Sequence, residues 1–120
     1  MTDIVIARRR SERAALVDVA RQWADQAGPS LGARAIVVVG SVARGDFNKW
    51  SDIDVLVVVD ELPDDLQDRL ALLGRTRKPP GVEAMAWTAA ELADRRAQRT
   101  DPIARDAYDL GVVIHGRLPD

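Results

Sequence analysis

Residues 35–59 read AIVVV-GSVARGDFNKWS-DIDVLVVV, two apolar runs on either side of a short polar segment. Unbroken apolar runs of this length are typical of strands that are covered on both faces of a sheet. We therefore expect strands at residues 35–39 and 53–59. The Gly40-Ser41 pair that follows the first run predicts a tight turn, because glycine adopts backbone conformations that other residues avoid. The centre of the fold is thus predicted to be strand, Gly-Ser turn and a second strand that opens with two carboxylates.

The two carboxylates, Asp52 and Asp54, lie two residues apart, so a strand would point both to the same face at a separation of roughly 6.6 Å. Carboxylates in this arrangement suit a pair of metal ions about 3.5–4 Å apart. They also repel each other and lose hydration at a buried strand, and a cation relieves both effects. The alternative is that Asp52 ends a loop and Asp54 is a solvated strand residue.

The Gly40-Ser41 turn is the second candidate site. Its free backbone N–H groups and the Ser41 hydroxyl offer hydrogen bonds to a phosphate, and Gly40 lets the backbone approach closely. Alone, the pair is equally typical of an ordinary strand-to-helix turn. Beside Asp52 and Asp54 it indicates the β- and γ-phosphates of a nucleoside triphosphate. Arg44 is placed to reach a phosphate or the departing pyrophosphate, or is simply a surface residue.

Helices are expected on both sides of this centre. An amphipathic pattern over residues 11–27 predicts a first helix, which Gly28-Pro29 would end. A second helix is expected to open at Pro63, with acidic residues in its first turn. The run Thr88 to Glu91 is a capping box that predicts a third helix. A fourth would begin at Asp101-Pro102, as N-cap and first helical residue, and end at Gly111.

Two further strands are expected, at residues 82–87 and 112–115. With about four strands, short linkers and alternating helices, the fold class is α/β at the border of α+β. We expect one domain over residues 1–120, a small mixed sheet with helices packed against it.

Lys49 and Trp50 precede the acidic pair and are candidates to touch the base or the acceptor. For Trp50, packing over the rim of the site is the favoured role. Trp23 and Trp87 are expected in the core, and His115 is expected to be structural.

The spacing of these motifs resembles that of a known protein family. Gly40-Ser41, ten intervening residues and Asp52-Ile53-Asp54 resemble the signature of the DNA polymerase β-like nucleotidyltransferase superfamily. The fuller run GSVARG at 40–45, ahead of Ser51 and the acidic pair, is similar to its minimal nucleotidyltransferase (MNT) branch. The tail, from Asp101-Pro102-Ile103 to residues 111–114, also resembles these domains. The similarity extends from about residue 35 to 116.

The resemblance implies a chemistry. An acidic residue on a neighbouring strand completes the first metal site of this family, and here Glu83 is the candidate, although the family usually has Asp. Asp52, Asp54 and Glu83 would hold one Mg²⁺, and the two aspartates would hold a second. An acceptor hydroxyl would attack the α-phosphorus of ATP and take up AMP, with no covalent enzyme intermediate. A solvated Glu83 on a half-exposed strand is the alternative for that residue.

Composition excludes several other classes of site. The chain has 120 residues, 47% of them hydrophobic, no cysteine and one histidine, so disulfides, thiolate metal sites and histidine-based zinc sites are not expected. The net charge of −2 argues against general capture of nucleic acid, and three arginine-rich clusters are interpreted as solvated helix ends and loops. No apolar run is long enough for a membrane helix and no signal peptide is apparent, so we expect a cytoplasmic protein.

The residues alone do not identify the molecule that accepts the nucleotide. Little chain follows the metal strands, so we expect the acceptor site to come from another chain. MNT proteins typically pair with a small helical HEPN protein as antitoxin and toxin, and the antitoxin can attach AMP to its partner, as in type VII-like pairs. Two alternatives are the catalytic subunit of a small-molecule (aminoglycoside-type) nucleotidyltransferase and a non-catalytic antitoxin that acts by binding alone. Homo- or hetero-oligomers are compatible with each of these.

Overall fold

A four-stranded mixed sheet forms the centre of the protein, whose computed structural model describes residues 3–48 and 50–120. Lys49, a candidate for contact with the base or acceptor, lies outside the described residues. The strands lie in the order β3-β2-β1-β4. β1 is antiparallel to β2 and β4, whereas β2 is parallel to β3. Their bounds are Ala35–Val39 (β1), Ile53–Val59 (β2), Val82–Thr88 (β3) and Val112–Gly116 (β4). All four predicted strands are confirmed, and the architecture is α+β.

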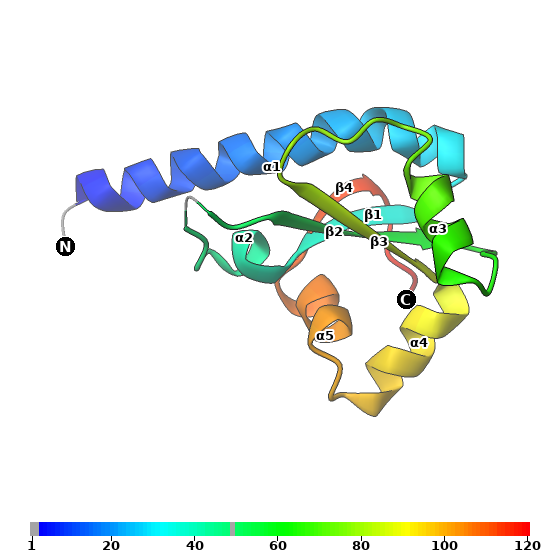
Figure 1. Cartoon of the computed structure of the whole chain (residues 1–120). Coiled ribbons are helices and arrows are strands. Elements are labelled where there is room, and N and C mark those ends of the chain that lie inside the picture. Colours follow the sequence, from blue (N-terminus) through cyan, green and yellow to red (C-terminus); the bar gives the residue numbers. More distant parts are fainter. Residues whose placement is uncertain (1–2, 49) are drawn as a thin grey trace.

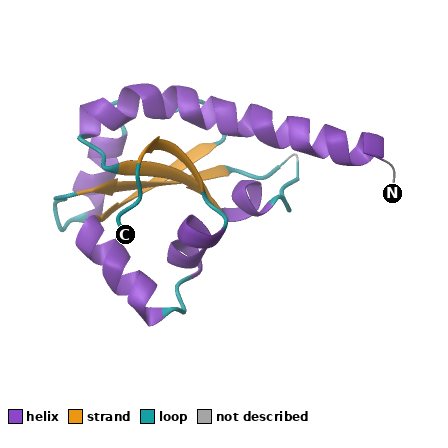
Figure 2. Ribbon diagram, turned by 180° about the vertical axis from the view of Figure 1, so that it is seen from behind, coloured by secondary structure: helices purple, strands orange, loops and turns teal. Residues whose placement is uncertain are grey.

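Helices cover both faces of the sheet, which explains the unbroken apolar runs of the two central strands. Figures 1 and 2 show α1 along one face and α4 and α5 against the other. β1 is buried throughout, and β2 is buried except at Asp54. Alternate residues of these strands therefore contribute to two separate apolar clusters, one under α1 and one under α4 and α5. The helices are Asp3–Leu31 (α1), Gly40–Arg44 (α2), Leu66–Leu73 (α3), Ala89–Gln98 (α4) and Pro102–Asp109 (α5).

The first helix is longer than predicted at both ends. It begins by Asp3 instead of residue 11, and its N-terminal part extends beyond the edge of the sheet in both ribbon views (Figures 1 and 2). At the other end the prediction that Gly28-Pro29 stops the helix was wrong, because Pro29 lies inside the helix. The helix instead ends in a Schellman motif, in which Ala33 N–H donates to the Gly28 carbonyl at 2.9 Å and Gly32 has a φ of 63°.

Gly28 is required for packing and not for termination. A β-carbon at this position would come within 2.5 Å of the His115 ring, so the absence of a side chain lets β4 lie against α1. This contact confirms a structural role for His115. On the same helix the predicted apolar face is confirmed. Ala20, Trp23 and Ala27 are buried, and Leu16 and Val19 pack against the cluster from its margin.

The later helices begin where short polar side chains cap them. α3 starts at Leu66, three residues after the predicted Pro63, because the Asp65 carboxylate accepts from the N–H groups of Gln67 and Asp68. The capping box of α4 is confirmed, since Thr88 and Glu91 exchange both expected hydrogen bonds. α5 begins as predicted, with Asp101 as N-cap and Pro102 in the first turn. No helix within the described ranges has the length and hydropathy needed to cross a bilayer.

Candidate active site

The Gly-Ser turn forms a sharp corner between β1 and α2. Gly40 has a φ of 72°, a left-handed conformation that side chains disfavour. A β-carbon on this residue would come within 2.6 Å of Oδ2 of Asp54, so glycine is needed for conformation and for space alike. Val39 is the N-cap of α2, and no side chain caps the helix there. The first N–H groups of α2 are therefore not capped by an N-cap side chain, and the turn that carries them lies beside the Asp54 carboxylate.

Asp54 is the central carboxylate of the site. It lies opposite Val39 on β1 and in register with Glu83 on β3, so these two acidic residues are direct neighbours across the parallel pair. Adjacent strands lie about 4.8 Å apart. Partial burial, with the nearby charges of Asp52 and Glu83, raises the pKa of Asp54 above its ordinary value, and Arg44 opposes this effect. The three predicted carboxylates thus share one electrostatic environment.

This donor set suits a hard divalent cation. Oxygen ligands are those that Mg²⁺ prefers. Burial, together with the like charges of Asp52 and Glu83, raises the pKa of Asp54, and a bound cation relieves both effects. The side chains are not drawn together in advance, since no three Asp, Glu or His residues among positions 3–48 and 50–120 lie close enough to hold an ion. Repulsion between like charges is a sufficient reason. Asp52 and Glu83 are exposed and have room to move toward Asp54, and their role as metal ligands remains a prediction.

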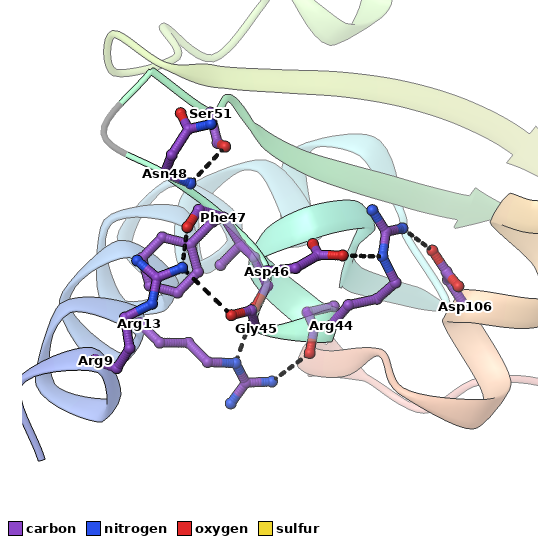
Figure 3. Close-up of polar contacts among 11 residues, drawn as sticks. Arg9, Arg13, Arg44, Gly45, Asp46, Phe47, Asn48, Ser51 and Asp106 are labelled. Carbon is purple, nitrogen blue, oxygen red and sulfur yellow. Dashed lines mark hydrogen bonds and ion pairs between the residues drawn. The ribbon is translucent and has the colours of Figure 1, made fainter. Parts of the chain in front are cut away.

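Arg44 joins the site to α5. Its guanidinium forms ion pairs with Asp106 at 2.7 Å and with Asp46 at 3.3 Å, as Figure 3 shows. Hydrogen bonds to Asp46 and Asp106 raise the pKa of Arg44, so it carries its positive charge throughout the physiological range. A phosphate would have to share this cation with two aspartates. Arg44 is therefore near the acidic cluster, and its predicted contact with phosphate stays a prediction.

Two arginines from α1 hold the segment that leads from α2 to the acidic pair (Figure 3). Arg13 donates from Nε to the Val42 carbonyl at 2.9 Å and from its amino group to the Ala43 carbonyl at 2.8 Å. Arg9 donates to the Phe47 carbonyl and lies over the Phe47 ring, 4.0 Å from its centre.

The prediction that residues 8–10 are merely a solvated cluster was therefore wrong for Arg9. The sequence held no signal for Arg9 and Arg13, since the groups they bind lie 29–38 residues further along the chain. The same holds for Asp106, which lies 62 residues after Arg44.

The tryptophans fall into three environments. Trp23 is in the core as predicted, and its indole N–H donates to the Thr76 carbonyl at 3.1 Å. Trp87 is half-buried beneath α4, where Arg95 lies over its ring. Trp50, two residues before Asp52, is 81% exposed. It is therefore less packed than we expected for a residue that covers the rim of the site.

Comparisons with known proteins agree on one family. The family described as "Nucleotidyltransferase domain" matches residues 24–103, which include the Gly-Ser turn, all three carboxylates and the start of α5. Among solved structures, a candidate nucleotidyltransferase from Sulfolobus solfataricus superimposes with a TM-score of 0.67 at 20% identity, over 91% of this chain and 87% of that one. No curated protein matches the sequence significantly. The structural likeness shows the fold, and the family match spans well over half of the sequence; the chain belongs to the nucleotidyltransferase domain family.

Proposed function

We propose that this protein transfers AMP from ATP to a hydroxyl group on a small helical partner protein of the HEPN type, in a Mg²⁺-dependent reaction. The register of Asp54 with Glu83, beside the glycine corner at residue 40, carries the proposal. This arrangement supports the proposal because it brings Asp54 and Glu83 next to the turn that we propose as the phosphate-binding element. An antitoxin role, in which the modification neutralises a toxin, follows from the resemblance to MNT proteins.

Each residue has a distinct part in this reaction. The N–H groups at the start of α2, with the Ser41 hydroxyl, would bind the triphosphate, and Arg44 would attract its charge. Asp52, Asp54 and Glu83 would hold magnesium, which when bound lowers the pKa of the acceptor hydroxyl and neutralises charge on the leaving pyrophosphate. The chain's own contribution is positioning. Gly40 sets the distance between turn and carboxylate, and Arg13 holds the carbonyl end of α2.

A surface next to the site suits the proposed partner. The outer end of α1 exposes Ile4 at 72%, Val5 at 48% and Ile6 at 42%. Between this end and the loop after α2 lies a groove of about 210 Å³, lined by Val5 and Ile6, three arginines of α1, and Gly45 and Phe47. An amphipathic helix with an apolar stripe and acidic flanks would be complementary to it in shape and charge. Such docking would bring a partner hydroxyl to the loop that precedes Asp52.

The experiment is co-production with a small helical protein of the HEPN type, followed by measurement of the intact mass of that protein. We expect an increase of one AMP that requires ATP and Mg²⁺ and is lost in Asp54→Asn. Val5→Asp should also reduce the modification while ATP binding persists, because it affects docking alone. An unmodified partner in a stable complex, still neutralised by Asp52→Ala/Asp54→Ala, would instead identify a binding module.

A small-molecule acceptor is tested in the same way. Incubation with ATP, Mg²⁺ and an aminoglycoside, without any partner protein, should leave the antibiotic mass unchanged. An AMP adduct on the antibiotic would contradict transfer to a protein.

A further inference from the structure

A pocket of about 400 Å³ lies between α4 and α5, outside the site described above. Its volume is in the range of small-ligand sites. Four arginines, Arg95, Arg96, Arg99 and Arg105, line it together with Asp101 and Asp109. In a chain with a net charge of −2, this is a local excess of positive charge.

The four arginines differ in the interactions that they already make within the protein. Arg95 is neutralised by an ion pair with Asp101 at 2.9 Å. Arg96 lies over the Tyr108 ring, with its Cζ 3.7 Å from the ring centre. Among the described residues, no carboxylate forms an ion pair with Arg96, Arg99 or Arg105. Several guanidinium groups therefore face one pocket with their donors available.

The backbone at Arg99 gives a second and independent indication. Arg99 is the C-cap of α4 in the left-handed conformation, with a φ of 60°, and is the one residue other than glycine with positive φ among those described. Glycine is the usual occupant of this kind of position because it carries no steric penalty there. Strained residues of this type concentrate at ligand sites. Favourable placement near the end of the α4 dipole accounts for Arg95 and Arg96, but not for Arg105 on α5 or for the strain at Arg99.

We infer that this pocket is a second anion site, which takes a small ligand bearing a phosphomonoester or diphosphate group. Guanidinium groups bind phosphate oxygens through paired hydrogen bonds. A phosphomonoester carries about −1.5 to −2 charges at pH 7, which complements four arginines set against two aspartates. The two aspartates and the concave shape disfavour an extended phosphodiester chain, so the ligand is a free metabolite-sized phosphate compound.

Isothermal titration with inorganic pyrophosphate tests this directly. The protein is Asp52→Ala/Asp54→Ala in EDTA, so that nucleotide binding with Mg²⁺ at the proposed catalytic site does not contribute. We expect binding with a dissociation constant below about 1 mM, and a loss of about tenfold in affinity in Arg99→Gly and again in Arg105→Ala. Arg77→Ala, which removes the same charge elsewhere, should change affinity by less than about twofold.

Thermal unfolding separates binding from folding. Arg99→Gly relieves the left-handed conformation, so its melting temperature should rise while its affinity falls. Equal pyrophosphate affinity in Arg99→Gly and its parent would overturn the inference, as would no binding at all to a folded protein. A short single-stranded RNA that binds more tightly than pyrophosphate would replace the small ligand with a nucleic acid. None of these outcomes depends on nucleotidyl transfer.

Discussion

Gly40 lies so close to Asp54 that a β-carbon on residue 40 would stand 2.6 Å from Oδ2 of the aspartate. The turn that would bind phosphate and the carboxylate that would bind metal are thus in direct contact, before any ligand arrives. This contact couples the geometry of one to the other. A change at either residue displaces both halves of the site.

Gly40→Ala should therefore lower nucleotidyl transfer by more than about tenfold, because the new methyl displaces the Asp54 carboxylate. The substitution also strains a φ of 72°, at a cost of about 1–2 kcal/mol in the free energy of unfolding. Gly32→Ala is the matched control, since Gly32 has a φ of 63° and open space around its α-carbon. Steady-state rates and urea unfolding of both variants make the comparison. Equal losses of activity would show that strain alone matters.

Asp54→Asn should raise the melting temperature of the metal-free protein at pH 7. Because burial and the charges of Asp52 and Glu83 raise the pKa of Asp54, the native state binds this proton more tightly than the unfolded state. Stability is then lost as pH rises from the unfolded pKa through the raised native pKa, and the asparagine variant escapes this loss. Melting curves in EDTA from pH 3 to 8 test the sign. Asp25→Asn, on the exposed side of α1, is the matched control for the loss of one carboxylate.

The same Asp54→Asn variant should transfer nucleotide at roughly one hundredth of the original rate or less, the scale on which charge-stabilising groups act. Added Mg²⁺ and ATP should raise the melting temperature of the original protein but not that of the variant, since only a ligand that binds the native state stabilises it. A variant that retains full activity would remove Asp54 from the site.

Arg13→Ala should destabilise the protein by about 1–3 kcal/mol, because the carbonyls of Val42 and Ala43 lose a charged donor. The rate of transfer should fall as well, since these carbonyls belong to the helix that begins with the phosphate-binding turn. Arg13→Lys should restore part of both. Arg8→Ala, an exposed position on the same helix, should leave stability within about 0.5 kcal/mol. Chemical denaturation and initial rates give the two readouts.

Asp101→Ala should cost about 1 kcal/mol at pH 7, because Asp101 caps α5 by accepting from the N–H groups of Ile103 and Ala104. These hydrogen bonds and Arg95 lower the pKa of Asp101 below its ordinary value. The stabilisation is therefore complete above the unfolded pKa of about 3.9 and disappears as pH falls through the lower native pKa. The difference in stability between the Asp101→Ala variant and its parent should close in acid. Asp94→Ala, at an exposed position of α4, is the control and should change stability at pH 7 by less than about 0.5 kcal/mol.

Local rules predicted much of this fold because several signals agreed. Four of the predictions rest on signals that lie within a few residues of each other, and all four are confirmed. They are the apolar runs at 35–39 and 53–59, the Thr88 capping box and the helix start at Asp101-Pro102. Spacing pointed to Asp52, Asp54 and the Gly-Ser corner as candidate site residues, whereas Glu83 became a candidate only through the family resemblance. Their placement in one region depends on the parallel pairing of β2 with β3, which the spacing alone did not establish.

Local rules failed where a distant contact decided the outcome. Gly28-Pro29 looks like a helix stop, but the His115 ring leaves no room for a side chain at position 28, and the helix continues to Leu31. Residues 3–10 lack an amphipathic pattern, yet Arg9 binds a loop 38 residues away. Arg44 finds Asp106 on a helix that lies at the far end of the sequence. These contacts join residues that are far apart in the sequence, so no local sequence pattern could have predicted them.

The reach of α1 has a practical consequence for anyone who trims this protein for expression. The amphipathic pattern invites a new start at Ser11, which would leave every apolar core residue in place. That cut would remove Arg9, and with it the donor to the Phe47 carbonyl, five residues before Asp52. It would also remove Val5 and Ile6 from the groove proposed to dock the partner. An inactive but well-folded truncation would then be mistaken for evidence against catalysis, although the catalytic residues themselves were intact.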